Sequence, residues 1–138
     1  MIRPALRLSP TAPFPHVAVV VPCYNYGRFL VDCVESVVSQ PGVETSVHIL
    51  DDASTDGSFG VAQELEARYG NVRATRNPIN LGHIATYNTG LAQVDSDYVV
   101  LLSADDQLAP GALGRATALM EAHPSVGLVY GHPQTFSE

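Results

Sequence analysis

The chain of 138 residues contains no lysine, because all seven of its basic residues are arginines. Charged residues make up only 15% of the chain, and the net charge is −7. A general nucleic-acid-binding protein needs clusters of basic side chains, and none occur here. An acidic protein that binds a phosphate ligand must offset the repulsion between the negative charges of the two. A bound divalent cation usually does this.

Cysteines and long apolar runs are also scarce. Cys23 and Cys33 are too few for a disulfide framework and have no zinc-like partners, so we interpret them as small buried apolar side chains. We therefore expect a cytoplasmic location, either in solution or peripheral at the inner face of the membrane. No apolar run approaches the roughly 20 residues of a membrane-spanning helix. Residues 1–15 carry four prolines and no apolar signal segment, which predicts an extended leader before a domain at residues 16–138.

The rest of the chain alternates between apolar runs and segments of helical periodicity. Short, mostly β-branched runs predict buried strands at Val17–Val21, Val47–Leu50, Val72–Thr75, Tyr98–Leu102 and Val126–Tyr130. Helical spacing predicts helices at Arg28–Ser39, around Ala62–Tyr69, at His83–Val94 with Ile84, Tyr87 and Leu91 in line, and after Pro110 up to His123. This order predicts an α/β fold with a mostly parallel sheet and helices on both faces.

Polar residues gather where the predicted strands end, which is where parallel sheets bind ligands. Tyr24 and Asn25 follow the first strand, Asp51-Asp52 the second and Asp105-Asp106 the fourth. Neighbouring carboxylates at a strand end repel one another and are partly desolvated, so a cation or a donor-rich ligand would stabilise them.

Each feature has a functional and a structural interpretation. Asp105-Asp106 suits Mg²⁺ or Mn²⁺ shared with a diphosphate, although the pair could instead be capping or solvated loop acids ahead of Pro110. Asp51-Asp52 suits hydrogen bonding to a base or ribose, or else complements the dipole of the following helix. Tyr24 either stacks on a base or packs within the protein.

Four segments resemble motifs of the family-2 glycosyltransferases, in the order and spacing of that family. They are VVVPCYNYGRFL (19–30), HILDDASTDGS (48–58), NPINLGHIATYNTGL (77–91) and DYVVLLSADDQLAPGAL (97–113). The resemblance covers about residues 17–130. It implies a GT-A type, Rossmann-like fold and a nucleotide diphosphate-sugar donor, most often a UDP-sugar, with a saccharide or other hydroxyl as acceptor.

The resemblance also implies roles for individual residues. Tyr24, within the loop Pro22–Asn25, would flank the base, and Asp52 would accept a hydrogen bond from it, supported by Asp51. Asp105 and Asp106 would occupy the position of the metal-binding DxD motif, one holding the metal and the other contacting sugar or ribose. The full nucleotide-binding set that the resemblance implies is Pro22, Tyr24, Asn25, Asp51, Asp52, Asn80, Gly82, Asn88 and Asp105.

The chain departs from the family pattern at two positions and lacks one group. Ser103 replaces a frequent acidic residue, which removes one ribose or metal contact, and Tyr87 stands where many relatives place an arginine. Inverting sugar transfer also needs a general base, and no carboxylate or histidine here suits that role. We therefore expect no catalytic residue in this chain and a fold truncated before the acceptor half.

Two other functions are compatible with parts of the pattern. A degenerate donor domain that serves as an interaction module would keep the fold without nucleotide affinity. A receiver-type signalling domain also pairs acids at strand ends, but it needs a lysine after the fifth strand, and the chain has none.

Overall fold

A computed structural model describes residues 14–136, which contain a four-stranded parallel sheet. Its strands are β1 (His16–Cys23), β2 (Glu44–Asp51), β3 (Val72–Arg76) and β4 (Tyr98–Leu101), in the order β3-β2-β1-β4. The helices are α1 (Gly27–Val38), α2 (Ser58–Arg68), α3 (His83–Leu91) and α4 (Ala112–Ala122). The predicted leader, residues 1–15, lies outside the described residues except for Phe14 and Pro15.

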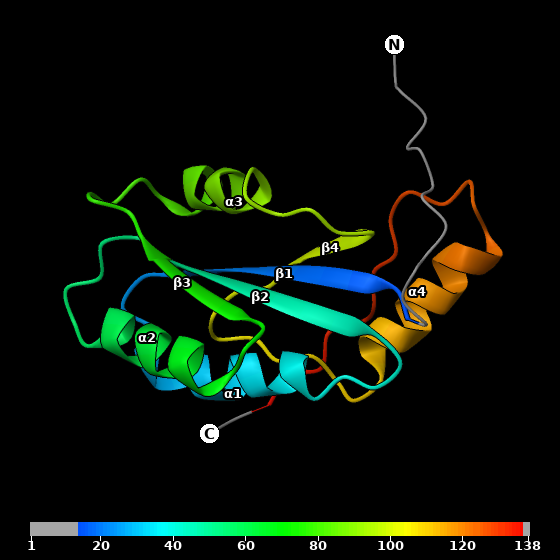
Figure 1. Cartoon of the computed structure of the whole chain (residues 1–138), viewed down its shortest axis with the longest axis horizontal. Coiled ribbons are helices and arrows are strands. Elements are labelled where there is room, and N and C mark those ends of the chain that lie inside the picture. The colour runs from blue at the N-terminus through cyan, green and yellow to red at the C-terminus, as the bar shows by residue number, and fades with distance from the viewer. Residues whose placement is uncertain (1–13, 137–138) are drawn as a thin grey trace, which may run out of the picture.

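Helices cover both faces of the sheet, as predicted (Figure 1). α1 and α2 pack on one face and α3 on the other. Alternate residues of β1 point to opposite faces. Val17, Val19 and Val21 join the core beneath α1 and α2, whereas Val20 faces α3. Both cysteines are buried free thiols within this core, which agrees with their interpretation as small apolar side chains.

The contact face of α3 differs from the predicted one. The apolar line through Ile84 and Leu91 does not pack inward, and Ile84 is 68% exposed. Instead Thr86 and Gly90 are buried, because Gly90 lets the helix backbone lie directly against Val20 and Leu50 of the sheet. The helix also ends at Leu91 rather than Val94.

Two predicted strands differ from the structure. β4 is not buried throughout, because Val99 and Leu101 are exposed. They lie on the face of the sheet that carries α3, but α3 packs over β1 and β2 and leaves β4 uncovered. The predicted fifth strand, Val126–Tyr130, pairs with no described strand, and its residues are largely exposed. An apolar, β-branched run forms a strand only where a neighbouring strand completes its hydrogen bonds.

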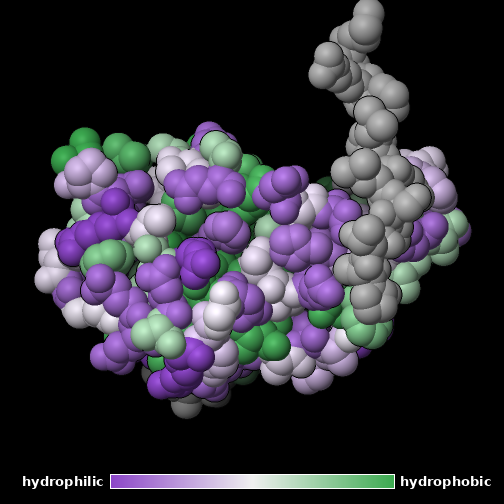
Figure 2. Space-filling model, viewed as in Figure 1, coloured by the Kyte–Doolittle hydropathy of each residue, from purple (hydrophilic) through white to green (hydrophobic). Residues whose placement is uncertain are grey.

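The surface of the described region is mostly polar in the view of Figure 2. An apolar patch lies over the loop between β3 and α3, where Ile79 and Leu81 are exposed. Among residues 14–136, no helix is long and apolar enough to cross a bilayer.

The close approach of α3 predicts opposite effects for two helical glycines. A Cβ at Gly90 would overlap Val20 Cγ1 and lie 2.9 Å from Leu50 Cδ1, whereas a Cβ at Gly60 in α2 meets nothing within 4 Å. We expect Gly90→Ala to lower the free energy of unfolding by about 1–3 kcal/mol through overpacking. Gly60→Ala should raise it by about 0.5–1 kcal/mol through helix propensity. Urea unfolding of the two variants measures both effects, and equal stabilisation by the two alanines would contradict the packing described.

Candidate functional site

The loops that follow the four strands meet at one end of the sheet. β1 and β2 end opposite each other at Cys23 and Asp51, and Asp51 is in turn opposite Arg76 at the end of β3. The segment after β4 continues the ladder, because Leu102 N donates to Val20 O at 3.0 Å. The predicted site residues after β1, β2 and β4 are therefore brought to the same end of the molecule.

Asn25 joins the loop after β1 to the loop after β2. It adopts a left-handed backbone conformation (φ 57°), which asparagine tolerates better than most residues. Its Oδ1 accepts hydrogen bonds from Thr55 N at 2.9 Å and Asp56 N at 3.3 Å, and its own N donates to Ser54 Oγ at 3.0 Å. Asn25 thus fixes the relative position of the two loops.

Tyr24, unlike the half-buried Asn25, is an exposed residue. The residue is 43% exposed at the start of the loop, and Pro22, within β1, is half-buried. Tyr26, which is 42% exposed, has its ring 5.7 Å from that of Phe29. Of these two tyrosines, Tyr24 is the one whose ring face is not paired with another aromatic ring among residues 14–136.

Asp51 is a fully buried carboxylate with an arginine beside it. Its Oδ2 lies 3.3 Å from Arg76 Nε and accepts from Ser54 N at 3.1 Å. Arg76 also donates to Ser54 O at 2.8 Å, so the arginine ties the ends of β2 and β3 together. Within residues 14–136, Asp51 Oδ1 is the buried side-chain oxygen that has no hydrogen-bond partner.

Asp52 is 3% exposed and holds the loop between β3 and α3. Its Oδ1 accepts from Asn77 Nδ2 and Leu81 N, both at 2.8 Å, and its Oδ2 accepts from Gly82 N at 2.9 Å. Burial opposes ionisation of this carboxyl, but hydrogen bonds from Asn77, Leu81, Thr86 and Gly82 outweigh it and lower the pKa of Asp52. The carboxylate is therefore a structural charge whose Oδ2 can accept one further donor.

The remaining residues predicted in this loop lie at its surface. Gly82 directly precedes α3 with a positive φ of 82°, a conformation that favours glycine. Asn80 Oδ1 accepts from Gly82 N at 3.1 Å, and Asn88 is exposed on α3. Asn77 and Arg76 are not among the site residues predicted from the sequence, although both stand at the end of β3, where a functional polar residue is expected.

Asp105 and Asp106 contrast with the first aspartate pair. Both are exposed, and within residues 14–136 no hydrogen bond or ion pair engages either carboxylate. Burial, followed by the charges of Asp106 and Asp105, raises the pKa of Tyr87, so α3 places this tyrosine near the pair. Burial and the charges of Asp106, Cys23 and Asp105 raise the pKa of Cys33 to about 12.

The donor set at Asp105-Asp106 fits a hard cation only if the ligand completes the coordination. Among the described residues, no group of three or more histidine, cysteine or acidic side chains could hold a metal. Mg²⁺ and Mn²⁺ commonly take one or two carboxylates and complete their shell with water and substrate phosphates. Two free adjacent carboxylates are compatible with that mode and not with a closed protein cage.

Comparison with known proteins gives a family and a fold. The sequence profile of glycosyl transferase family 2 matches residues 18–138. A chondroitin synthase of Escherichia coli is 34% identical over 99 residues, which cover 72% of this chain and 14% of that protein. The chain therefore spans a small part of this much longer relative.

Two solved structures share the fold at 24% identity. The mannosyltransferase PcManGT from Pyrobaculum calidifontis, in complex with GDP-Man and Mn²⁺, has a TM-score of 0.75, covering 83% of this chain and 34% of that one. S. aureus TarS in complex with UDP-GlcNAc has a TM-score of 0.73, covering 86% of this chain and 37% of that one. Both likenesses confirm the predicted GT-A type fold, and this chain spans about a third of the length of each neighbour.

The role of Asp52 as an internal acceptor predicts a specific acid dependence. Asp52→Asn should lower the free energy of unfolding by about 2 kcal/mol at pH 7, since hydrogen bonds to a charged group are lost. Because the pKa of Asp52 is lowered in the folded state, this difference should persist down to the ordinary aspartate pKa and shrink only below it.

Urea unfolding of both proteins between pH 7 and pH 3 tests this dependence. Asp95→Asn is the control, because Asp95 is exposed and no described residue engages its side chain. A difference that already disappears near pH 6, or an equal loss in the control, would contradict the assignment.

Proposed function

This chain belongs to glycosyl transferase family 2, and on that premise we propose that it binds the nucleotide diphosphate-sugar donor of an inverting glycosyltransferase. The enzyme would move the sugar from the nucleotide to an acceptor hydroxyl. The observation that carries the proposal is the contrast between the two aspartate pairs at one end of the sheet. Asp51-Asp52 is buried and engaged by the protein, whereas Asp105-Asp106 is exposed and free to bind a ligand.

We assign the diphosphate end of the donor to Asp105-Asp106. With a net charge of −7, the chain offers no basic cluster to neutralise a diphosphate. Mg²⁺ or Mn²⁺ shared between these carboxylates and the phosphates would neutralise the leaving group. The fold neighbour bound to GDP-Man and Mn²⁺ supports this assignment.

We assign the nucleoside end to the loops after β1, β2 and β3. The exposed ring of Tyr24 would stack on the base, and Asp52 Oδ2 would accept the base N–H, for which uracil is our expectation. Pro22, Asn25 and Asp51 would shape the loop beneath the base, and Asn80, Gly82 and Asn88 would form the wall beside it. The neighbour in complex with UDP-GlcNAc supports this choice of base, and the GDP-Man complex represents the alternative.

We assign the acceptor site and the general base to residues beyond those of this chain. The base would take the proton of the acceptor hydroxyl as its oxygen attacks the anomeric carbon and the nucleotide diphosphate departs. The greater length of the fold neighbours supports this division.

Free buried thiols at Cys23 and Cys33 support a reducing, cytoplasmic setting. An interaction module without nucleotide affinity is the competing function.

Removal of the free carboxylates should abolish metal-dependent binding. Asp105→Asn combined with Asp106→Asn should weaken UDP binding in Mn²⁺ by more than roughly 100-fold, since loss of even outer-shell partners of a metal costs about 10–100-fold. Isothermal titration calorimetry with and without EDTA measures the effect on the full chain.

The matched control is Glu64→Gln with Glu66→Gln on α2, which removes the same charge away from the site. Wild-type protein that binds no UDP in either Mn²⁺ or Mg²⁺ would overturn the proposed function and favour the interaction module. Equal losses in both double variants would show that only net charge matters.

Tyr24 and Tyr26 allow a matched test of base stacking, because their exposed fractions are 43% and 42%. Tyr24→Ala should weaken UDP binding by about 1–3 kcal/mol, the usual contribution of a base–aromatic stack. Tyr26→Ala should leave the affinity nearly unchanged, since its ring pairs with Phe29.

The same titration with GDP in place of UDP tests the identity of the base. Tighter binding of GDP than of UDP would overturn the choice of uracil.

A further inference from the structure

The segment that carries Asp105-Asp106 contains no regular secondary structure. It runs from the end of β4 to the start of α4, and its internal backbone hydrogen bonds are Asp106 N to Ser103 O and Ala112 N to Ala109 O, both at 3.0 Å. A metal site needs its ligands held within a fraction of an ångström, and so few internal bonds do not fix a loop of this length.

Side chains from α1 and the residues just after it supply the missing support. Leu108 N donates to Ser36 Oγ at 3.0 Å, and Gln40 Nε2 donates to Ala109 O at 3.0 Å. Gln40 Oε1 accepts from Leu113 N at 3.1 Å, at the start of α4. Cys33 Sγ adds a weaker contact to Ser103 O at 3.6 Å. All of these contacts reach backbone atoms, so they fix the path of the loop whatever its side chains are.

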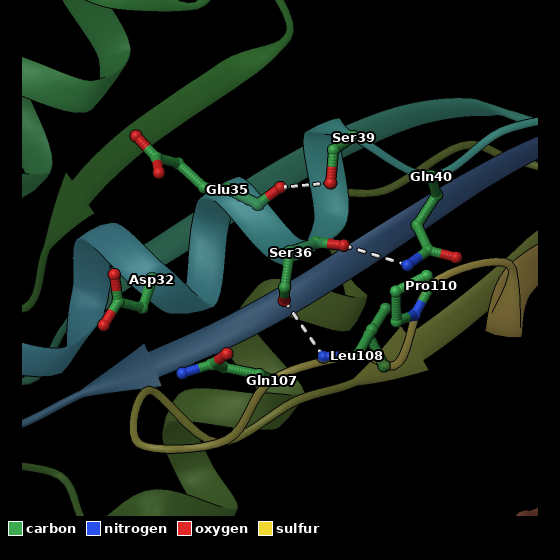
Figure 3. A pocket seen from close by; sticks show the side chains of 8 residues that line it. All are labelled: Asp32, Glu35, Ser36, Ser39, Gln40, Gln107, Leu108 and Pro110. Carbon is green, nitrogen blue, oxygen red and sulfur yellow. Dashed lines mark hydrogen bonds between the residues drawn. The ribbon is translucent and has the colours of Figure 1, made fainter. Parts of the chain in front are cut away.

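Ser36 and Gln40 are themselves held in place. Ser36 Oγ donates to Cys33 O at 2.7 Å, and Gln40, only 7% exposed, donates a second hydrogen bond to Ser36 O at 2.9 Å. In Figure 3 the two side chains lie between α1 and the loop, at a cavity of about 340 Å³ that Ser39 and Leu108 also line. Ser39 Oγ instead donates back to Glu35 O of α1 at 2.7 Å.

We propose that Ser36 and Gln40 are positioning residues for the metal–diphosphate end of the site. They connect α1, which packs on the sheet, to the loop that presents Asp105 and Asp106. The inference rests on the proposed function and adds to it two residues that touch neither metal nor nucleotide. Holding the loop lowers the cost of ordering it when the metal–nucleotide binds.

The test compares two serines about one turn apart, Ser36 in α1 and Ser39 directly after it. The readout is the Mn²⁺ concentration that gives half-maximal binding of UDP at a fixed UDP concentration, measured on the full chain. Ser36→Ala and Gln40→Met should each raise it roughly 10-fold, the order expected when a support of a metal ligand is lost. Ser36→Thr keeps the hydroxyl, has the adjacent cavity for its extra methyl group, and should restore the wild-type value.

Ser39→Ala is the matched control, because it removes a hydroxyl that lines the same cavity and donates to Glu35 O, with no hydrogen bond to the loop among the described residues. It should leave the Mn²⁺ requirement unchanged. Melting temperatures separate folding from positioning. Variants of Ser36 and Gln40 that melt earlier but keep the wild-type Mn²⁺ requirement would overturn the positioning role alone. Absence of Mn²⁺-dependent UDP binding in the wild-type chain would overturn the proposed function as well.

Discussion

The parallel pairing of β1 with both β2 and β4 is the constraint on which the whole site depends. Because the three strands run in the same direction, the segments after Cys23, Asp51 and Leu101 emerge at one end of the sheet. An antiparallel β4 would place Asp105-Asp106 at the opposite end from Asp51-Asp52. The pairing is held by a core of valines on β1 that is buried on both faces, so the geometry of the site follows from packing at the centre of the sheet.

The two aspartate pairs look alike in the sequence and differ in their physical state. Asp52 is buried, and it stays ionised because four donors, including two backbone N–H groups, surround it. Asp51 has Arg76 beside it. Asp105 and Asp106 remain exposed and free of described partners. One pair therefore organises the loops of the site, and the other is available to a cation. Ser36 of α1 and Gln40 just after it bond the backbone of the loop that carries the second pair, at Leu108 and Ala109, and we propose that they order it.

The sequence predicts the parts of this structure that depend on local pattern. Continuous apolar runs at Val17–Val21 and Val47–Leu50 indicate central strands, and a pair of acids directly after a strand indicates the ligand-binding end. Tertiary contacts decide the rest. The burial of Gly90 and the exposure of Ile84 depend on how closely α3 approaches Val20, and the apolar run Val126–Tyr130 has no described strand to pair with. The bonds from Asn77 to Asp52 and from Gln40 to Ala109 join segments 25 and 69 residues apart, which no periodicity reveals.

The proposed function depends on binding of the metal–diphosphate end of a nucleotide at Asp105-Asp106. Paramagnetic broadening of backbone amide signals, recorded with UDP while Mn²⁺ replaces Mg²⁺ in small steps, locates the bound metal. We expect the amides of residues 104–107 to broaden first, while those of α2 at residues 64–68 are spared. Broadening centred on another acidic segment, such as Asp95–Asp97, or an absence of broadening that depends on UDP, would contradict it.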